Sequence, residues 1–190
     1  ILAPYKNLIV LRPGIVYGPN SPLWSNYIGK LLVSGLIGDL GAEGEGFCNL
    51  VYVDDVVFAI TESILRIDLA GQAFNLASPA PLVTWNDYFR LYGKALGLQQ
   101  VMKIPKWRLQ LEAHLLAGPR KIAELAGTRL PSLKWHPTPA LRPWLLKLVN
   151  HRIIQDVRKS ESLLNIRWKP IQDGLAQTAD SFWNSQGRSF

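Results

Sequence analysis

Short apolar runs that alternate with helical patterns constrain the fold of this chain more than any other feature of its sequence. Three runs are rich in β-branched and other apolar residues and are too short for typical helices: residues 7–16, 50–53 and 73–77. Each precedes a segment with apolar residues at helical spacing: residues 24–36, 56–65 and 84–97. Strands and helices that alternate in this way are typical of βαβ units. The sequence therefore predicts an α/β fold with a mainly parallel sheet.

The starts of two predicted helices carry capping signals. Thr84 and Asp87 have the spacing of a capping box, in which each side chain bonds the backbone N–H of the other residue. Asp54 or Asp55 is suited to cap the preceding helix, because a carboxylate oxygen can accept from a free N–H group in the first turn. These polar residues predict where the two helices begin.

The second half of the chain has a different composition from the first. Residues 103–126 form an amphipathic helical pattern, and residues 131–143 are rich in proline and tryptophan. Residues 156–183 indicate a short helix, a turn and a final helix. We therefore predict two regions, residues 1–102 and residues 103–190.

Composition and charge exclude several classes of protein. With 48% hydrophobic and 18% charged residues over 190 positions, the chain is typical of a globular protein rather than a disordered or fibrous one. The net charge of +7 is concentrated in residues 103–169, which hold fourteen Lys and Arg residues against four Asp and Glu. No nucleic-acid-binding motif accompanies this charge, so no nucleic-acid partner is predicted.

Cysteine and histidine content limit the chemistry of the chain. The single Cys48 cannot form an internal disulfide, which favours a reducing compartment and predicts a cytoplasmic location. His114, His136 and His151 are too scattered for a recognisable metal site, so no metal is predicted. No apolar stretch approaches the length of a membrane-spanning helix.

Four motifs, in the same order along the chain, resemble the C-terminal part of the extended short-chain dehydrogenases/reductases, the NAD-dependent epimerase/dehydratase family. They are Arg12-Pro13-Gly14-Ile15-Val16-Tyr17-Gly18-Pro19, Val51-Tyr52-Val53-Asp54-Asp55-Val56, Phe74-Asn75-Leu76-Ala77, and Leu163-Leu164-Asn165-Ile166-Arg167-Trp168-Lys169-Pro170 with Gly174-Leu175 and Trp183 beyond it. The resemblance covers about 175 residues. It implies the C-terminal part of a Rossmann-type doubly wound parallel sheet with a small, mostly helical substrate region. Residues 1–102 would belong to the NAD(P)-binding core and residues 103–190 to the substrate side.

The resemblance also implies a nicotinamide cofactor, either NAD or NADP. Pro13, Val16 and Tyr17 would lie near it, because the family's first motif ends a strand at the sheet edge where open α/β folds bind ligands. The alternative is that this motif only ends a strand and forms a tight turn. The residue that selects between NAD and NADP is expected outside the chain.

The family's catalytic pair is missing from this sequence. No tyrosine has a lysine four residues later, so no catalytic residue is assigned, and the resemblance places the Tyr-x-x-x-Lys pair before Ile1. The chain alone is therefore expected to be inactive. The string Gly35-x-x-Gly38-x-x-Gly41 imitates a dinucleotide loop, but a helical pattern precedes it and two glutamates follow it. We do not assign it to phosphate binding.

Three functions remain open at this stage. The first is an epimerase or dehydratase of a nucleotide sugar, with Asn49, Arg129 and Arg158 as candidate substrate-binding residues. Cys48 occupies the position where such enzymes often carry a phosphate-binding arginine, which is a departure from that pattern. The second resembles 3β-hydroxysteroid dehydrogenases and dihydroflavonol reductases, which act on apolar alcohols. The third is a non-catalytic dinucleotide-binding sensor.

Each enzyme reading predicts a small-molecule substrate. The insert at residues 104–130 also resembles the group that acts on apolar alcohols, and it could line an apolar pocket, touch a membrane surface or simply belong to the core. A homodimer is left open, because the family is often dimeric.

Overall fold

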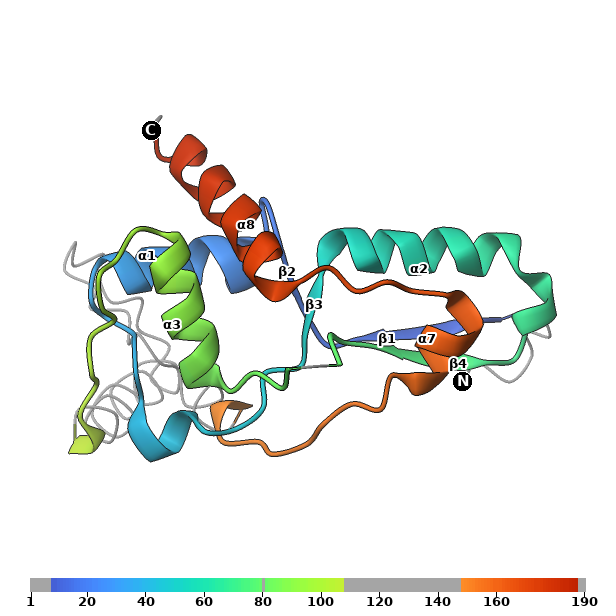
Figure 1. Cartoon of the computed structure of the whole chain (residues 1–190), viewed down its shortest axis with the longest axis horizontal. Coiled ribbons are helices and arrows are strands. Elements are labelled where there is room, and N and C mark those ends of the chain that lie inside the picture. The colour runs from blue at the N-terminus through green and yellow to red at the C-terminus, as the bar shows by residue number, and fades with distance from the viewer. Residues whose placement is uncertain (1–7, 80, 108–147, 188–190) are drawn as a thin grey trace, which may run out of the picture.

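The computed structural model describes residues 8–79, 81–107 and 148–187 (Figure 1). Its strands form two parallel pairs: β1 (Val10–Pro13) pairs with β4 (Ala73–Leu76), and β2 (Ile15–Tyr17) pairs with β3 (Leu50–Tyr52). The helices are η1 (Pro22–Tyr27), α1 (Ile28–Val33), η2 (Gly41–Gly44), α2 (Val53–Leu65), η3 (Ile67–Leu69), α3 (Trp85–Ala95), α7 (Arg158–Leu164) and α8 (Ile171–Ser185). The predicted α/β class with parallel strands is confirmed.

The first predicted strand is divided at Gly14. The N–H of Gly14 donates to Leu76 O at 2.9 Å, whereas the N–H of the next residue, Ile15, donates to Asn49 O at 2.7 Å. Because consecutive N–H groups of a strand point to opposite edges, the chain pairs with β4 on one edge and with β3 on the other as it passes Gly14. A Cβ at Gly14 would lie 2.2 Å from Asn49 O, so this close approach of two backbones requires glycine.

The predicted cap of α2 is wrong. The helix begins at Val53, with Tyr52 as its N-cap residue and no side-chain cap bond. Asp54 and Asp55 lie inside the first turn instead, where a carboxylate is favoured by the helix dipole. Because the helix starts earlier than the apolar spacing suggests, the carboxylate of Asp55 is directed to another segment, as described below.

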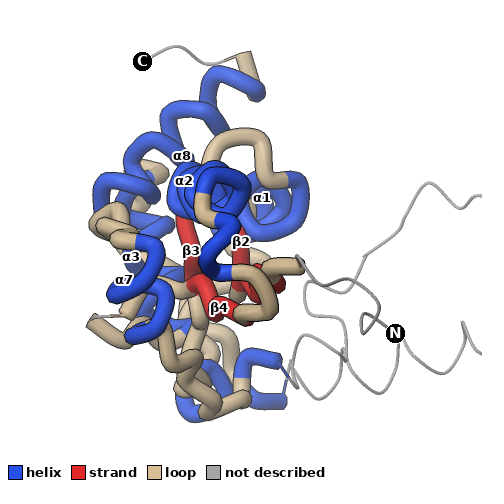
Figure 2. The backbone as a smooth tube through the Cα atoms, turned by 90° about the vertical axis from the view of Figure 1, so that its right-hand side faces the viewer, coloured by secondary structure: helices blue, strands red, loops and turns tan. Residues whose placement is uncertain are grey.

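Two apolar clusters hold the structure together, and Figures 1 and 2 show the corresponding groups of elements. The larger cluster joins α1, α3 and α8, and its fully buried side chains include Trp85, Tyr88, Phe89, Tyr92 and Phe182. The smaller one lies between α2, α7 and the β1–β4 pair and includes Val51, Phe74, Leu76, Leu164 and Ile166. Strand β3 contributes to both clusters, because Leu50 and Tyr52 belong to the larger one and Val51 to the smaller one. Among the described helices, none is long and apolar enough to cross a bilayer.

The capping box at the start of α3 is confirmed. The side chain of Thr84 accepts from the Asp87 N–H at 3.1 Å, and the Asp87 carboxylate accepts from the Thr84 N–H at 3.0 Å. Trp85, the first residue of α3, is fully buried. The cap therefore fixes the direction in which the helix enters the larger cluster.

We expect Thr84→Ala to lower the free energy of unfolding by about 1 kcal/mol, because an N–H in the first turn loses its acceptor. Ser34→Ala is the matched control: the exposed Ser34 hydroxyl bonds only to carbonyls of its own helix end, and its loss should cost less. Urea unfolding of both variants checks this. Equal losses would show that the cap contributes nothing specific.

Candidate functional site

Three of the sequence motifs meet in one cluster, which we call the motif cluster: Tyr17, Tyr52, Asp55, Lys169 and Gly174. The rings of Tyr17 and Tyr52 meet edge to face with centroids 5.4 Å apart. Lys169 Nζ lies 4.6 Å from the centroid of the Tyr52 ring. Gly174 packs against the Tyr17 ring and hydroxyl so closely that a Cβ there would lie 2.4 Å from the oxygen. The motifs therefore act first as a packing unit.

Asp55 links α2 to the turn before α8. Its Oδ2 accepts from the backbone N–H of Lys169 at 3.2 Å, and Lys169 Nζ lies 3.9 Å from the neighbouring Asp54. Asp55 is buried, with 8% of its surface exposed. Burial raises the pKa of its carboxyl above the usual value, and the Lys169 N–H opposes that rise. The bond joins positions that are 114 residues apart in sequence.

Tyr17 is a core residue in this structure. Only 1% of its surface is exposed, and burial raises the pKa of its phenol, with the charge of Asp55 as the next cause. The neighbouring Tyr52 hydroxyl donates to Gln177 Oε1 at 2.7 Å. The Tyr17 phenol therefore stays protonated at neutral pH. Its ring packs against Tyr52 and Gly174.

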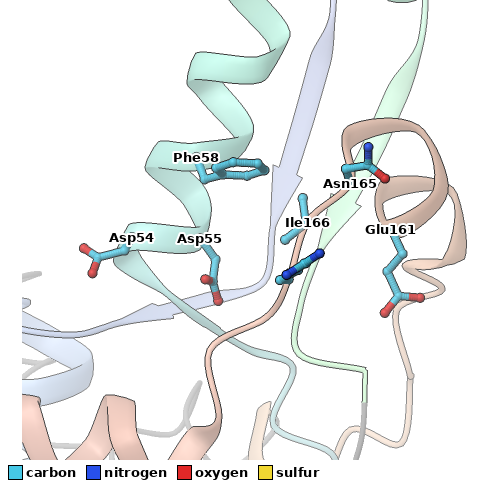
Figure 3. A pocket seen from close by; sticks show the side chains of 7 residues that line it. Asp54, Asp55, Phe58, Glu161, Asn165 and Ile166 are labelled. Atoms are coloured by element: carbon cyan, nitrogen blue, oxygen red, sulfur yellow. The ribbon is translucent and has the colours of Figure 1, made fainter.

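A cavity of about 730 Å³ lies between the start of α2 and α7 (Figure 3). Figure 3 shows Asp55 and Phe58 extending from α2 toward the segment that carries Ile166, with Glu161 on α7. Its carboxylates are already engaged, because Glu161 Oε1 accepts from Trp168 Nε1 at 3.0 Å and Asp55 binds the Lys169 N–H. The cavity is therefore bounded by the two hydrogen bonds that hold Trp168 and Lys169, just before α8. Within the described residues, no group of three or more His, Cys, Asp or Glu side chains is placed to bind a metal.

A segment over residues 149–157, which we call the strap and which is neither helix nor strand from His151 on, lies beside the residues that precede β3. The N–H of Gly46 donates to Val149 O at 3.0 Å, and the N–H of Phe47 donates to His151 O at 2.8 Å. Asn49 then continues this ladder with its side-chain amide: Nδ2 donates to Ile153 O at 2.9 Å, and Oδ1 accepts from Gln155 N at 3.0 Å. Sequence analysis missed the strap, because isolated polar residues give no signal for such pairing.

The strap ends on β4. Asn75 Nδ2 donates to Asp156 O at 3.0 Å, and the Ser160 hydroxyl donates to Asn75 O. The Asp156 carboxylate accepts from the N–H of Arg158 at 3.1 Å, at the start of α7. Asn49, just before β3, and Asn75, inside β4, therefore hold one segment beside strands of both parallel pairs.

The predicted cofactor residues lie at the end of β1 and in β2. Pro13 ends β1 and is exposed, whereas Val16 is half buried and its carbonyl accepts from the Ser21 hydroxyl at 3.4 Å. Tyr17 is buried in the motif cluster. A ligand beside Pro13 would therefore meet the main chain and Pro13 rather than the Tyr17 hydroxyl. These assignments stay predictions.

The predicted substrate residues have other partners or lie outside the described part. The Asn49 amide is fully used by the strap. Arg158 forms an ion pair with its near neighbour Asp156, with Nη2 and Oδ2 2.6 Å apart. Arg129 lies outside the described residues, as does most of the insert at 104–130. Cys48 is buried, with 4% of its surface exposed, and burial raises the pKa of its thiol.

The glycines that imitate a dinucleotide loop have structural roles. Gly35 has a φ of +66° just after α1, a left-handed conformation that favours glycine at a helix end. Gly38 lies against the backbone of Met102, where a Cβ would be 2.0 Å from the carbonyl oxygen. Because a helix precedes these glycines, they do not form the strand, loop and helix of a phosphate site.

The parallel strands and the convergence of the motifs define the fold of the extended short-chain dehydrogenases/reductases, the NAD-dependent epimerase/dehydratase fold, and solved structures bear this out. UDP-glucuronic acid 4-epimerase from Bacillus cereus superposes with a TM-score of 0.59 at 16% identity, over 94% of this chain and 46% of that one. Human epimerase family protein SDR39U1, solved with NADPH, gives 0.58 at 14% identity, over 90% and 48%. The chain therefore spans about half the length of these relatives.

A curated relative is detectable from sequence. The chain is 25% identical over 182 residues to the 3beta-hydroxysteroid-dehydrogenase/decarboxylase isoform 1 of Arabidopsis thaliana, across 90% of this chain and 39% of the relative. No protein-family model matches the chain. The sequence relative is thus named as a steroid dehydrogenase, whereas the structural relatives include epimerases of UDP sugars.

We expect Asp55→Ala to lower the free energy of unfolding by about 1–3 kcal/mol, because the Lys169 N–H loses its acceptor. Asp55→Asn keeps an acceptor oxygen and removes the buried charge, so its loss should be smaller. Chemical denaturation of both variants at neutral pH compares them. An Asn variant as unstable as the Ala variant would show that the charge, rather than the acceptor, holds the turn.

The difference in stability between Asp55→Asn and the unmodified chain should depend on pH. The folded pKa of Asp55 is raised, so between the unfolded pKa and the folded pKa the folded state binds more protons. The contribution of Asp55 to stability therefore falls as the pH rises through that window. We expect the stability of Asp55→Asn, relative to the unmodified chain, to rise above about pH 4 and then level off. A difference that does not change with pH would contradict the raised pKa.

We expect Asn49→Ala to release the strap. The Gln155 amide proton loses its acceptor, so its hydrogen exchange should accelerate at least tenfold, while the amide of Phe47, bonded to His151 O, should change less. Asn184→Ala, on the exposed end of α8, is the control. Unchanged exchange at Gln155 would mean that the Asn49 side chain does not hold the strap.

Proposed function

We propose that this chain forms the substrate side of an NAD(P)-dependent enzyme that acts on the secondary alcohol of an apolar molecule. The carrying observation is the chemistry of the strap and of the segment that it covers. Cys48, at the position where the resemblance expects a phosphate-binding arginine, is buried, and Arg158 is paired with Asp156. The strap itself presents two exposed isoleucines, Ile153 at 62% and Ile154 at 48% exposure.

The sequence relative supports the same substrate class. Its name gives a 3β-hydroxysteroid dehydrogenase and decarboxylase, which acts on a secondary alcohol attached to an apolar ring system. A rigid ring system of this kind gains affinity by burying apolar surface, at about 25 cal/mol per Å². Exposed isoleucines beside a sheet edge suit that contact, whereas a diphosphate needs cationic groups.

The cofactor would be NAD or NADP, as in the structural relatives solved with NAD and with NADPH. The residues at the edge fit a flat group that contacts main chain, because Pro13 is exposed and the Tyr17 side chain is withdrawn into the core. When bound, the nicotinamide would accept or donate the hydride. This chain would position the substrate, and the Tyr-x-x-x-Lys pair expected before Ile1 would move the proton.

A second candidate is an epimerase or dehydratase of a nucleotide sugar, favoured by structural relatives such as the UDP-glucose 4-epimerase of Thermotoga maritima, with a TM-score of 0.54 at 20% identity. In that case Arg152, exposed on the strap, or Arg129 would bind the diphosphate. A non-catalytic dinucleotide sensor is the third candidate, and it predicts cofactor binding without turnover.

Turnover and thermal shift of the whole protein produced from its source gene separate these candidates. With NAD or NADP, we expect oxidation of a 3β-hydroxysterol with kcat/KM at least tenfold above that for UDP-glucose. Stabilisation by UDP-glucose and not by the sterol would favour the nucleotide-sugar reading. Cofactor binding with neither substrate turned over would favour the sensor.

One substitution tests the role of the strap. Ile154→Glu places a charge on the proposed apolar surface and should raise KM for the sterol several-fold while leaving NAD(P) affinity unchanged. Leu82→Glu is the matched control, since Leu82 has a similar exposure of 46% and lies outside the strap. An equal effect of both variants on KM would remove the strap from the substrate site.

A further inference from the structure

A cavity with cationic walls, which we call the basic cavity, lies at the C-terminal end of α3. Its volume is about 450 Å³, within the range of about 300–1,000 Å³ that is common for small-molecule sites. Its charged walls are Arg90, Lys94, Lys103 and Asp39. In Figure 1, α3 lies on the left of the described part and the β1–β4 pair lies on the right. The residues that line the basic cavity belong neither to the motif cluster nor to the strap, so it is a separate feature.

The cations of the basic cavity have little compensation. Arg90 Nη2 lies 2.7 Å from Asp87 Oδ1, but Lys94 and Lys103 form no ion pair with any described residue. Arg90 and Lys94 are four residues apart on α3, a spacing at which like charges repel. The Asp39 carboxylate accepts from a backbone N–H two residues further along its own loop. An anion in the basic cavity would therefore relieve the repulsion between its cations.

Backbone contacts hold the walls of the basic cavity in place. Just after α3, the N–H of Leu98 donates to Gly93 O at 2.9 Å. Val101 packs on Gly93 so closely that a Cβ there would lie 2.5 Å from Val101 Cγ1. On the other side, Asp39 and Lys103 are joined by an isolated parallel bridge. The backbone of both walls is thus fixed before a ligand binds, and only the lysine side chains have to become ordered.

The turn after α3 offers hydrogen-bond donors and apolar surface together. The N–H groups of Gln99, Gln100 and Val101 donate to no described backbone carbonyl, and successive N–H groups in a turn can bind an anion. Leu98 and Val101 are half buried and add apolar side chains to the same walls. A bare anion would leave these two side chains uncovered. The walls therefore suit an anionic group that carries an apolar substituent.

We propose that the basic cavity binds a phosphate monoester, with its phosphate between Lys94 and Lys103 and its apolar substituent on Leu98 and Val101. Lysine binds phosphate as a point charge, and the N–H groups of the turn supply direction. The carbonyls at the end of α3 disfavour an anion, but Lys94 lies in that last turn and offsets them. The proposal does not rest on the substrate proposed above.

Titration of the whole protein with phenyl phosphate tests the proposal. We expect saturable binding by isothermal titration calorimetry, with affinity at least tenfold lower in the double variant Lys94→Gln/Lys103→Gln and lower at high salt, because exposed charges are screened. Lys106→Gln is the matched control: Lys106 lies on the same segment but pairs with Glu43 at 3.0 Å, outside the basic cavity, and its loss should leave the affinity unchanged. All three lysines are exposed, so the variants should keep the melting temperature of the unmodified protein.

Two further ligands complete the experiment. Inorganic phosphate should bind at least tenfold more weakly than phenyl phosphate, because it does not cover the apolar walls. Sedimentation with phosphatidylcholine vesicles that contain phosphatidic acid, if it is lost in the double variant, would assign the phosphate to a lipid headgroup. Binding of phenyl phosphate without sedimentation would assign it to a soluble ester, and either result supports the site.

Three outcomes would overturn the proposal. They are the absence of saturable phenyl phosphate binding, an affinity that is the same in the double variant, and inorganic phosphate that binds as tightly as the ester.

Discussion

The bend at Gly14 is the constraint on which the rest of the structure depends. By sending consecutive N–H groups to Leu76 and Asn49, the chain pairs β1 with β4 and β2 with β3 within a few residues. Only glycine allows the approach to Asn49 O that this requires. Strand β3 then joins the two apolar clusters, because its side chains alternate between them.

Polar side chains hold two segments that are distant in sequence. Asp55 binds the backbone of Lys169, and the Asn49 and Asn75 amides bind the backbone of the strap. The Asp55 bond is partly buried, where an unsatisfied main-chain group is costly, whereas the two asparagine bonds are exposed. These side chains therefore join segments that are far apart in sequence. Their loss should change the position of the strap and of the residues before α8 more than that of the strands.

Sequence patterns predicted the features that depend on neighbouring residues. The alternation of strands and helices and the Thr84–Asp87 capping box both involve side chains within a few positions of each other, so periodicity and spacing were sufficient. The contact of Asp55 with Lys169 and the pairing of Asn49 with the strap join residues more than 100 positions apart. A single sequence carries no distance information for such pairs. The same limit explains why the sequence alone predicts a local cap for Asp55.

The surface chemistry around the strap depends on which side chains these hydrogen bonds leave exposed. Cys48 faces the core while its backbone N–H binds Val83 O, so the segment before β3 offers no charged group to a ligand. Asn49 is occupied by the strap, and Arg158 is neutralised by Asp156. What remains at the edge is the outward side of the strap, with Ile153 and Ile154 beside Arg152. Substrate preference in this fold can therefore change through a few residues of a covering segment while the strands and their register stay the same.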